Sequence, residues 1–208
     1  MMGNNSGFTL VEMALVLIII GIIIGAVVKG KDLVRGAEQK RIYSKFLSEW
    51  RIAYLNFYDR TGKRLGDFYD AANTAAGQDG ICDTDEDGDG AVADTDRNAL
   101  EVGPTAGTAF KGLDNVGLDS PVTNTPNSFQ YDYTDVDGVT HNMKITFLNG
   151  GNYNYMQITP IPTELAIAID TMIDGEADGT SGDFQEDAAG AWDPDPATIE
   201  TARWRLQF

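Results

Sequence analysis

The chain has 208 residues, enough for one globular domain plus an extension, and it carries 32 acidic against 15 basic residues. The resulting net charge of -17 repels phosphate backbones, so we expect no nucleic-acid binding. A single cysteine, Cys82, and a single histidine exclude both an intrachain disulfide and a zinc site built from Cys and His ligands.

An almost continuous apolar run, residues 8–28, dominates the N-terminal part and follows a short polar segment, residues 1–7. As a helix, the run would span about 30 Å, the thickness of a hydrocarbon core. A secretory signal peptide is cleaved after its apolar region, whereas the candidate site here, the Gly7–Phe8 bond, lies before it. We therefore predict a leader at residues 1–7 and a membrane-spanning or filament-core half of a helix at residues 8–28.

One acidic residue, Glu12, interrupts this apolar run. A carboxylate inside a bilayer is costly and is retained where it finds a partner. If the Gly7–Phe8 bond is cut, a new α-amino group appears one helical turn from Glu12. In a stack of helices, the amine of one subunit can meet Glu12 of its neighbour, which offsets desolvation and fixes the register between the two.

The residues from Gly7 to Glu12, Gly-Phe-Thr-Leu-Val-Glu, resemble the prepilin processing motif shared by type IV pilins and type II secretion pseudopilins. The resemblance implies that a prepilin peptidase removes residues 1–7 and N-methylates Phe8, and that Phe8 and Glu12 guide assembly. It also implies as partners identical or related pilin subunits and an inner-membrane assembly platform. The subunit would be stored in the inner membrane and then enter a periplasmic pseudopilus or an extracellular pilus.

The distribution of basic residues departs from the family pattern. Residues 1–7 contain no Lys or Arg, and the first basic residues, Lys29, Lys31 and Arg35, follow the span. The positive-inside rule alone would place the C-terminal part in the cytoplasm. We follow the processing motif because it is the more specific signal. The alternative is a membrane-anchored, monomeric calcium-binding or adhesive module that keeps residues 8–28 as a permanent anchor.

Residues 29–60 are predicted to continue the helix as an amphipathic half that covers a sheet. Apolar residues recur there at spacings of three and four. The stripe consists of Leu33, Val34, Ala37, Ile42, Phe46, Leu47, Trp50, Ala53, Tyr54 and Phe57. Thr61-Gly62 is expected to end the helix. The pair Gly21 and Gly25 is either a small-residue packing face or a place where the helix stretches on assembly.

Residues 61–208 are predicted to form the globular head. Residues 61–128 look like a long connection with few apolar anchors. Strand signals follow at 128–134, 139–148, 153–159 and 203–208, with Asp137-Gly138 as a hairpin turn and a short helix at 163–173. The predicted fold class is α+β and pilin-like: a long N-terminal helix on a small antiparallel sheet with long loops.

An acidic loop at residues 79–97 is the main candidate for metal binding. It holds eight acids between Asp79 and Asp96 and no base. The spacing resembles EF-hand and dockerin calcium loops, in which carboxylates at positions 1, 3, 5 and 12 and the carbonyl at position 7 bind the ion. The assigned ligands are Asp85, Asp87, Asp89, Ala91 and Asp96. A shifted register would run from Asp83 to Asp94. We predict calcium, with a disordered acidic loop as the alternative.

The remaining candidates are weaker. Asp174, Glu176 and Asp178 repeat part of the calcium-loop spacing, but a structural turn explains them equally well. Cys82 is expected to be a free thiol, with intermolecular pairing as the alternative. His141 is expected at the surface or at a sheet edge, and Trp50, Trp192 and Trp204 in packing roles. The chain shows no nucleophile–base pair or phosphate loop, so we predict that it is not an enzyme.

Overall fold

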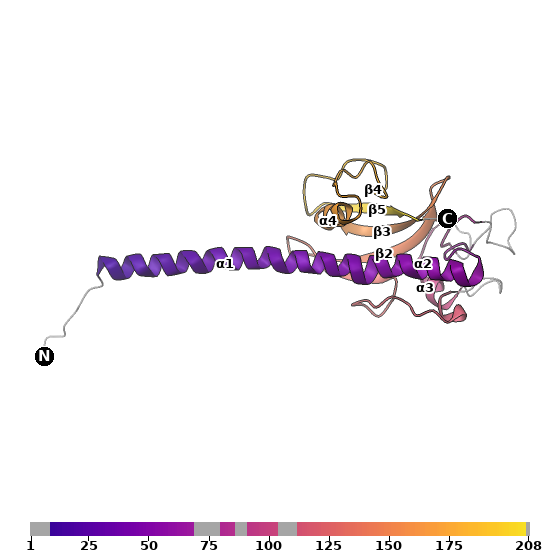
Figure 1. Cartoon of the computed structure of the whole chain (residues 1–208), viewed down its shortest axis with the longest axis horizontal. Coiled ribbons are helices and arrows are strands. Elements are labelled where there is room, and N and C mark those ends of the chain that lie inside the picture. The colour runs from indigo at the N-terminus through magenta and orange to yellow at the C-terminus, as the bar shows by residue number, and fades with distance from the viewer. Residues whose placement is uncertain (1–8, 69–79, 86–90, 104–111, 207–208) are drawn as a thin grey trace. The chain divides into compact units, whose positions relative to one another are not determined.

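The computed structural model describes residues 9–68, 80–85, 91–103 and 112–206 (Figure 1). It divides the chain into two compact units, Met1–Lys40 and Arg41–Phe208. In the part that the structure describes, the first unit is a single helical segment, and the second contains a five-stranded sheet with its covering helices. This is the predicted α+β, pilin-like class: a long N-terminal helix followed by a small antiparallel sheet.

The first helix, α1, spans Leu10–Ile42 and runs through Gly21 and Gly25 without a break. Of its residues, only Ile42 is buried. Leu10, Leu17 and Ile22 are each more than half exposed, as are most of the large apolar side chains up to Val28. Both glycines face open space, since a Cβ at either position would meet no heavy atom within 4 Å.

The helix continues through a π-helical turn, η1 (Tyr43–Leu47), into α2 (Ser48–Thr61). It ends where predicted, because Gly62 adopts a left-handed conformation with φ 69° and its N–H donates to the carbonyl of Tyr58. The predicted apolar stripe is confirmed from Ile42 onward, where its residues are buried. It was wrong at its start, since Leu33 is 76% and Val34 70% exposed. Periodicity identifies an apolar face but does not tell where that face meets the core.

The sheet is antiparallel throughout, with the strand order β1-β2-β3-β5-β4. Its strands are β1 (Gln130–Thr134), β2 (Thr140–Asn149), β3 (Asn154–Pro162), β4 (Phe184–Glu186) and β5 (Ile199–Arg205). The turn between β1 and β2 falls at Asp137-Gly138 as predicted, with Gly138 at φ 84°. The four predicted strands are present with shifted ends, and β4 was missed because three residues are too few to show an alternating pattern.

One face of the sheet carries the core, and η1 and α2 pack against it (Figure 1). Phe46 lies 5.2 Å from Tyr131 between ring centroids, and Phe147 contacts both Trp50 and Tyr54. All of these rings are buried. Aromatic pairs in such tilted and edge arrangements stabilise a core beyond the area they bury. The C-terminal part of the long helix, η1 and α2, is therefore a structural part of the head.

Three elements lie in the loops of the head. Helix α4 (Thr163–Ile173) matches the predicted short helix and contacts β3, β4 and β5. Helix α3 (Asp94–Val102) and the short 3-10 helix η2 (Asp114–Val116) were not predicted. Both lie in the stretch expected to be an irregular connection. Four of its few apolar residues are buried and anchor it to the head, namely Leu65, Phe68, Leu100 and Leu113.

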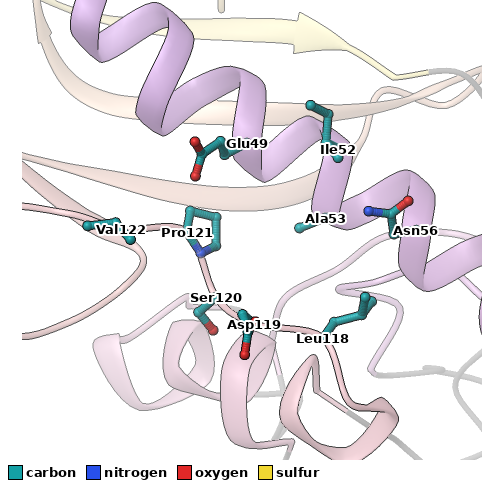
Figure 2. A pocket seen from close by; sticks show the side chains of 9 residues that line it. All are labelled: Glu49, Ile52, Ala53, Asn56, Leu118, Asp119, Ser120, Pro121 and Val122. Carbon is teal, nitrogen blue, oxygen red and sulfur yellow. The ribbon is translucent and has the colours of Figure 1, made fainter.

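A cavity of about 330 Å³ opens between α2 and the segment that follows η2 (Figure 2). One wall is the α2 face formed by Glu49, Ile52, Ala53 and Asn56. The other wall is residues 118–122.

Candidate functional site

Glu12 lies in the first turn of α1 and is bound to Thr9. The Thr9 N–H and the Thr9 hydroxyl donate to Glu12 Oε2, at 2.8 and 2.9 Å, and the Glu12 N–H donates to Thr9 Oγ1 at 3.3 Å. This reciprocal pattern is a capping box, which satisfies backbone donors at a helix start. The spacing Thr-x-x-Glu is the sequence signal for this capping box, which the sequence analysis did not include. Gly7 and Phe8 lie outside the described residues.

The helix behind Glu12 is apolar and exposed. An 18-residue window of the helical stretch Leu10–Thr61 has a mean hydropathy of 2.9 and none of that window is buried within the chain. By length and composition this helix can cross a membrane. Because exposed apolar surface of this extent is unfavourable in water, the segment requires a lipid or protein environment.

The predicted calcium loop is described only in part. Asp87 and Asp89 lie outside the described residues, and Asp85 and Ala91 flank that gap. Asp96 sits in the first turn of α3, where its Oδ2 accepts the N–H of Ala93 at 2.5 Å. Across the described ranges, no three His, Cys, Asp or Glu side chains gather closely enough to hold a metal ion.

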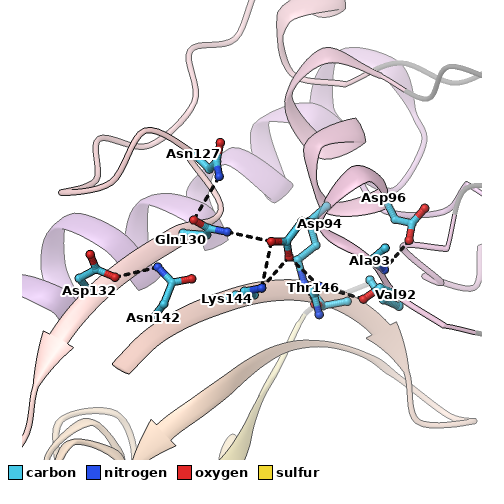
Figure 3. A network of polar contacts seen from close by, with 11 residues as sticks. Val92, Ala93, Asp94, Asp96, Asn127, Gln130, Asp132, Asn142, Lys144 and Thr146 are labelled. Carbon is cyan, nitrogen blue, oxygen red and sulfur yellow. Dashed lines mark hydrogen bonds and ion pairs between the residues drawn. The ribbon is translucent and has the colours of Figure 1, made fainter. Parts of the chain in front are cut away.

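The ends of the shifted register are bound elsewhere in the protein. Asp83 Oδ1 accepts the N–H of Phe68 at 3.0 Å, and Asp83 forms a β-bridge with Leu148. Asp94 lies at the centre of a polar network on the sheet (Figure 3). Its carboxylate contacts Lys144 Nζ at 2.7 Å and Arg97 at 3.3 Å. Both end residues of the shifted register are thus occupied by protein groups.

Arg97 anchors α3 to the sheet. Its Nε donates to Thr146 Oγ1 at 3.0 Å and its Nη1 to the carbonyl of Val92 at 2.8 Å. Burial lowers the pKa of the Arg97 guanidinium, an effect opposed by the neighbouring Asp94 and Asp96 carboxylates. Sequence reasoning missed this residue because its partner on the sheet, Thr146 of β2, lies 49 positions further along the chain.

The second acidic stretch is held by its own backbone. Asp174 accepts the N–H groups of Asp183 and Phe184, at 3.1 and 2.8 Å, through its two carboxylate oxygens. The Ser181 hydroxyl and the N–H groups of Ser181 and Thr180 donate to Asp178, and these bonds lower its pKa. These contacts are what the structural-turn interpretation expects of Asp174 and Asp178. Glu176 is exposed on the same turn.

A buried carboxylate, Asp170, lies beneath this turn. Its Oδ2 accepts Trp192 Nε1 at 2.7 Å and the N–H of Gly179 at 3.2 Å, while Oδ1 has no hydrogen-bond partner among the described residues. Desolvation raises the pKa of Asp170, and the nearby charges of Asp174 and Asp178 act in the same direction.

The single-residue expectations have definite outcomes. Cys82 is a free, buried thiol, and burial raises its pKa to about 12. The three tryptophans are buried packing residues, as predicted. His141 is not a plain surface residue. Its side chain is only 16% exposed and its Nε2 lies 2.7 Å from Asp135 Oδ2, which the strand pattern did not reveal.

Comparison with known proteins bears on the N-terminal segment. Residues 2–28 match the family model described as the prokaryotic N-terminal methylation motif. This is the signal motif of type IV pilins and pseudopilins, so the match confirms the resemblance seen at residues 7–12. It supports a structural pilin or pseudopilin subunit, and it implies processing by prepilin peptidase and assembly with pilin subunits. No curated protein and no solved structure matches the chain.

Proposed function

We propose that the chain is a structural subunit of a type IV pilus or a type II secretion pseudopilus, assembled through its N-terminal helix. The proposal rests on one observation, the overlap of the methylation motif with an exposed apolar helix. The methylation motif at residues 2–28 covers a helix whose apolar side chains are exposed and whose first turn holds a carboxylate. A plain anchor needs the apolar helix, but it needs neither the cleavage site before it nor the acid within it.

Prepilin peptidase cuts between Gly7 and Phe8 and N-methylates Phe8, and the processed helix passes to the inner-membrane assembly platform. The new amine of one subunit then pairs with Glu12 of a neighbour. The capping box supports this role in a specific way, because both Thr9 bonds fall on Oε2. Glu12 Oε1 makes no hydrogen bond among the described residues, and it is the oxygen that pairs with the amine of a second copy.

Residues 8–28 hold the subunit in the inner membrane until it assembles, with the head on the outer side. The mature protein then belongs to a periplasmic pseudopilus or an extracellular pilus. The net charge of -17 suits a secreted, soluble surface and disfavours binding to nucleic acid. The subunit acts by assembling, without catalysis of its own.

Calcium bound by residues 85–96 is part of the proposal. Of the two possible registers, the contacts support the one that starts at Asp85 and ends at Asp96. Lys144 already neutralises Asp94, and Asp83 caps the N–H of Phe68. Asp96 Oδ2 caps α3, and its Oδ1, which makes no hydrogen bond among the described residues, is the oxygen proposed for the ion. Bound calcium would supply positive charge to the stretch 79–96, which has eight acids and no base, and so tie this stretch to the start of α3.

A second candidate function is a monomeric anchored module, and one observation favours it. Thr9 and Glu12 satisfy each other within a single chain, so the carboxylate has a local use that needs no neighbour. In that case Glu12 would be a helix cap near the membrane surface.

The native N-terminus separates the two candidates. The protein is purified from the membranes of cells with and of cells without an active prepilin peptidase. The intact mass of the two preparations is then compared. A filament subunit begins at N-methylated Phe8 only in cells that contain the peptidase. A chain that keeps residues 1–7 in both cells contradicts the proposed function and leaves the anchored module.

A further inference from the structure

A small apolar face on α1 lies just beyond the membrane-spanning run. Gly30, Leu33, Val34 and Ala37 are spaced by three and four residues and so share one side of the helix. Leu33 is 76% and Val34 70% exposed, and Ala37 is exposed as well. We call these four residues the Leu33 face. Such a face, lying outside the hydrophobic run, indicates a contact that the isolated chain does not make.

Basic residues bracket the Leu33 face. Lys29 precedes Leu33 by one turn, and Arg41 follows Ala37 by one turn. Lys40 lies beside Arg41, and all three are exposed. The partner of this face therefore has apolar contact surface with acidic groups at its rim.

The cavity beside α2 has those properties (Figure 2). Ile52 on α2 and Val122 on the opposite wall are 53% and 79% exposed, and Ala53 and Pro121 line the cavity between them. Ile52, Ala53 and Asn56 follow one another at the spacing of a single helix face. We call this the α2 cavity. It is lined by Glu49, Ile52, Ala53 and Asn56 of α2 and by residues 118–122, and it offers apolar surface to the helix of another chain.

The rim of the α2 cavity is acidic. Glu49 lies on the helical wall and Asp119 on the loop wall. Asp119 is exposed, and the ion pair of Glu49 among the described residues is a surface one, with Lys45 at 3.6 Å. Exposed pairs of this kind contribute little, so Glu49 can turn to a second cation at small cost. The charges of the rim are opposite to those of Lys29, Lys40 and Arg41 beside the Leu33 face.

We infer that the Leu33 face of one subunit docks in the α2 cavity of a second copy of this chain. The inference rests on the proposed function, since it describes a contact inside the filament. The two surfaces differ, so the contact is heterologous, and repeated heterologous contacts build an open helical filament. Leu33 and Val34 lie against Ile52 and Val122, with Lys29 and Arg41 toward the acidic rim.

Paired cysteines test the contact in assembled filaments. Leu33→Cys and Val122→Cys are placed together in one chain, and filaments are oxidised. A heterologous contact links each copy to two others, so a ladder of multimers forms, whereas either single variant gives dimers at most. Cys82 is 1% exposed, so it is not expected to form crosslinks. The matched control pairs Leu33→Cys with Val139→Cys, which is 52% exposed at the β1–β2 turn, and is expected to give no ladder.

A second readout follows the reactivity of Leu33→Cys toward a polar maleimide. The thiol is expected to react in the membrane-stored subunit and to lose that reactivity in filaments. Protection already present before assembly identifies lipid headgroups as the occupant and overturns the inference. Filaments that carry processed Phe8 but give no ladder also overturn it, while the proposed function stands. Unprocessed chains without filaments overturn both.

Discussion

The backbone N–H and the hydroxyl of Thr9 donate to the same carboxylate oxygen of Glu12, at 2.8 and 2.9 Å. Glu12 is therefore a helix cap in the single chain as well as the residue to which the processing motif assigns assembly. The two roles use different properties of the side chain. Capping needs a hydrogen-bond acceptor, whereas pairing with the amine of a neighbouring copy needs the negative charge.

The anchoring of α3 depends on Arg97. Arg97→Met should destabilise the head by about 1–3 kcal/mol, because the buried Thr146 hydroxyl and the Val92 carbonyl lose their donor. Arg60→Met is the matched control, since Arg60 also donates to two carbonyls but from an exposed position. Urea unfolding of both variants checks the prediction. Equal losses in the two would contradict the anchoring role.

The β1–β2 turn should be sensitive to acid through Asp135. Burial raises the pKa of Asp135, but its bonds from His141, Val139 and Asp137 outweigh that effect and hold the pKa below the ordinary 3.8. A lowered pKa stabilises the folded state above pH 3.8, and the contribution is lost as pH falls through the folded pKa. Asp135→Asn should lower the melting temperature at neutral pH, and the gap should close below pH 3.8.

The control for Asp135→Asn is Asp137→Asn, which changes an exposed acid of the same turn. It should leave the melting temperature nearly unchanged. A gap between Asp135→Asn and the wild type that persists at low pH would mean that the charge of Asp135 is not the cause.

Asp170 should show the opposite pH dependence. Its pKa is raised from 3.8, so the folded state holds its proton more tightly than the unfolded state does. Stability is then lost as pH rises from 3.8 through the folded pKa. Asp170→Asn removes the buried charge and keeps an acceptor for Trp192 and Gly179. Thermal melts should show it at least as stable as the wild type at neutral pH, with the difference shrinking in acid. A large loss at neutral pH would show that the charge is needed.

Calcium should raise the thermal stability of the head. At a calcium concentration of 100 times its dissociation constant, binding adds about 2.7 kcal/mol to the free energy of unfolding. Thermal melts with calcium and with chelator measure this difference. Asp87→Asn together with Asp89→Asn should abolish it. Asp174→Asn is the control from the second acidic stretch and should retain it. An unchanged midpoint for the wild type would contradict the calcium proposal.

Local patterns were sufficient for the long helix and for most of the sheet. The apolar run, the stop at Gly62 and the Asp137-Gly138 turn are each encoded within a few neighbouring residues, and all three appear in the structure. The short helix at 163–173 was found for the same reason. These features depend on backbone preferences and spacing, which a single sequence records directly.

The features that were missed depend on contacts between distant segments. Asp94 and Asp96 were interpreted as the end of a metal loop, which concealed the helix that begins at Asp94. The bonds that support this helix run from Arg97 to Thr146 and from Asp94 to Lys144. The exposure of Leu33 was missed because an apolar stripe looks alike whether its partner lies in the same chain or elsewhere.

A comparison of filament assembly between the variants Glu12→Gln and Thr9→Val tests the central claim most directly. Gln keeps an acceptor for Thr9 but removes the charge, whereas Val removes the Thr9 hydroxyl, which donates to Glu12 and accepts its N–H, and keeps the charge. Both variants are first checked for a processed N-terminus by mass, and filament yield is then compared with the wild type. The account predicts that Glu12→Gln cripples assembly and that Thr9→Val largely preserves it. Wild-type yield from Glu12→Gln, with loss confined to Thr9→Val, would contradict it and reduce Glu12 to a helix cap.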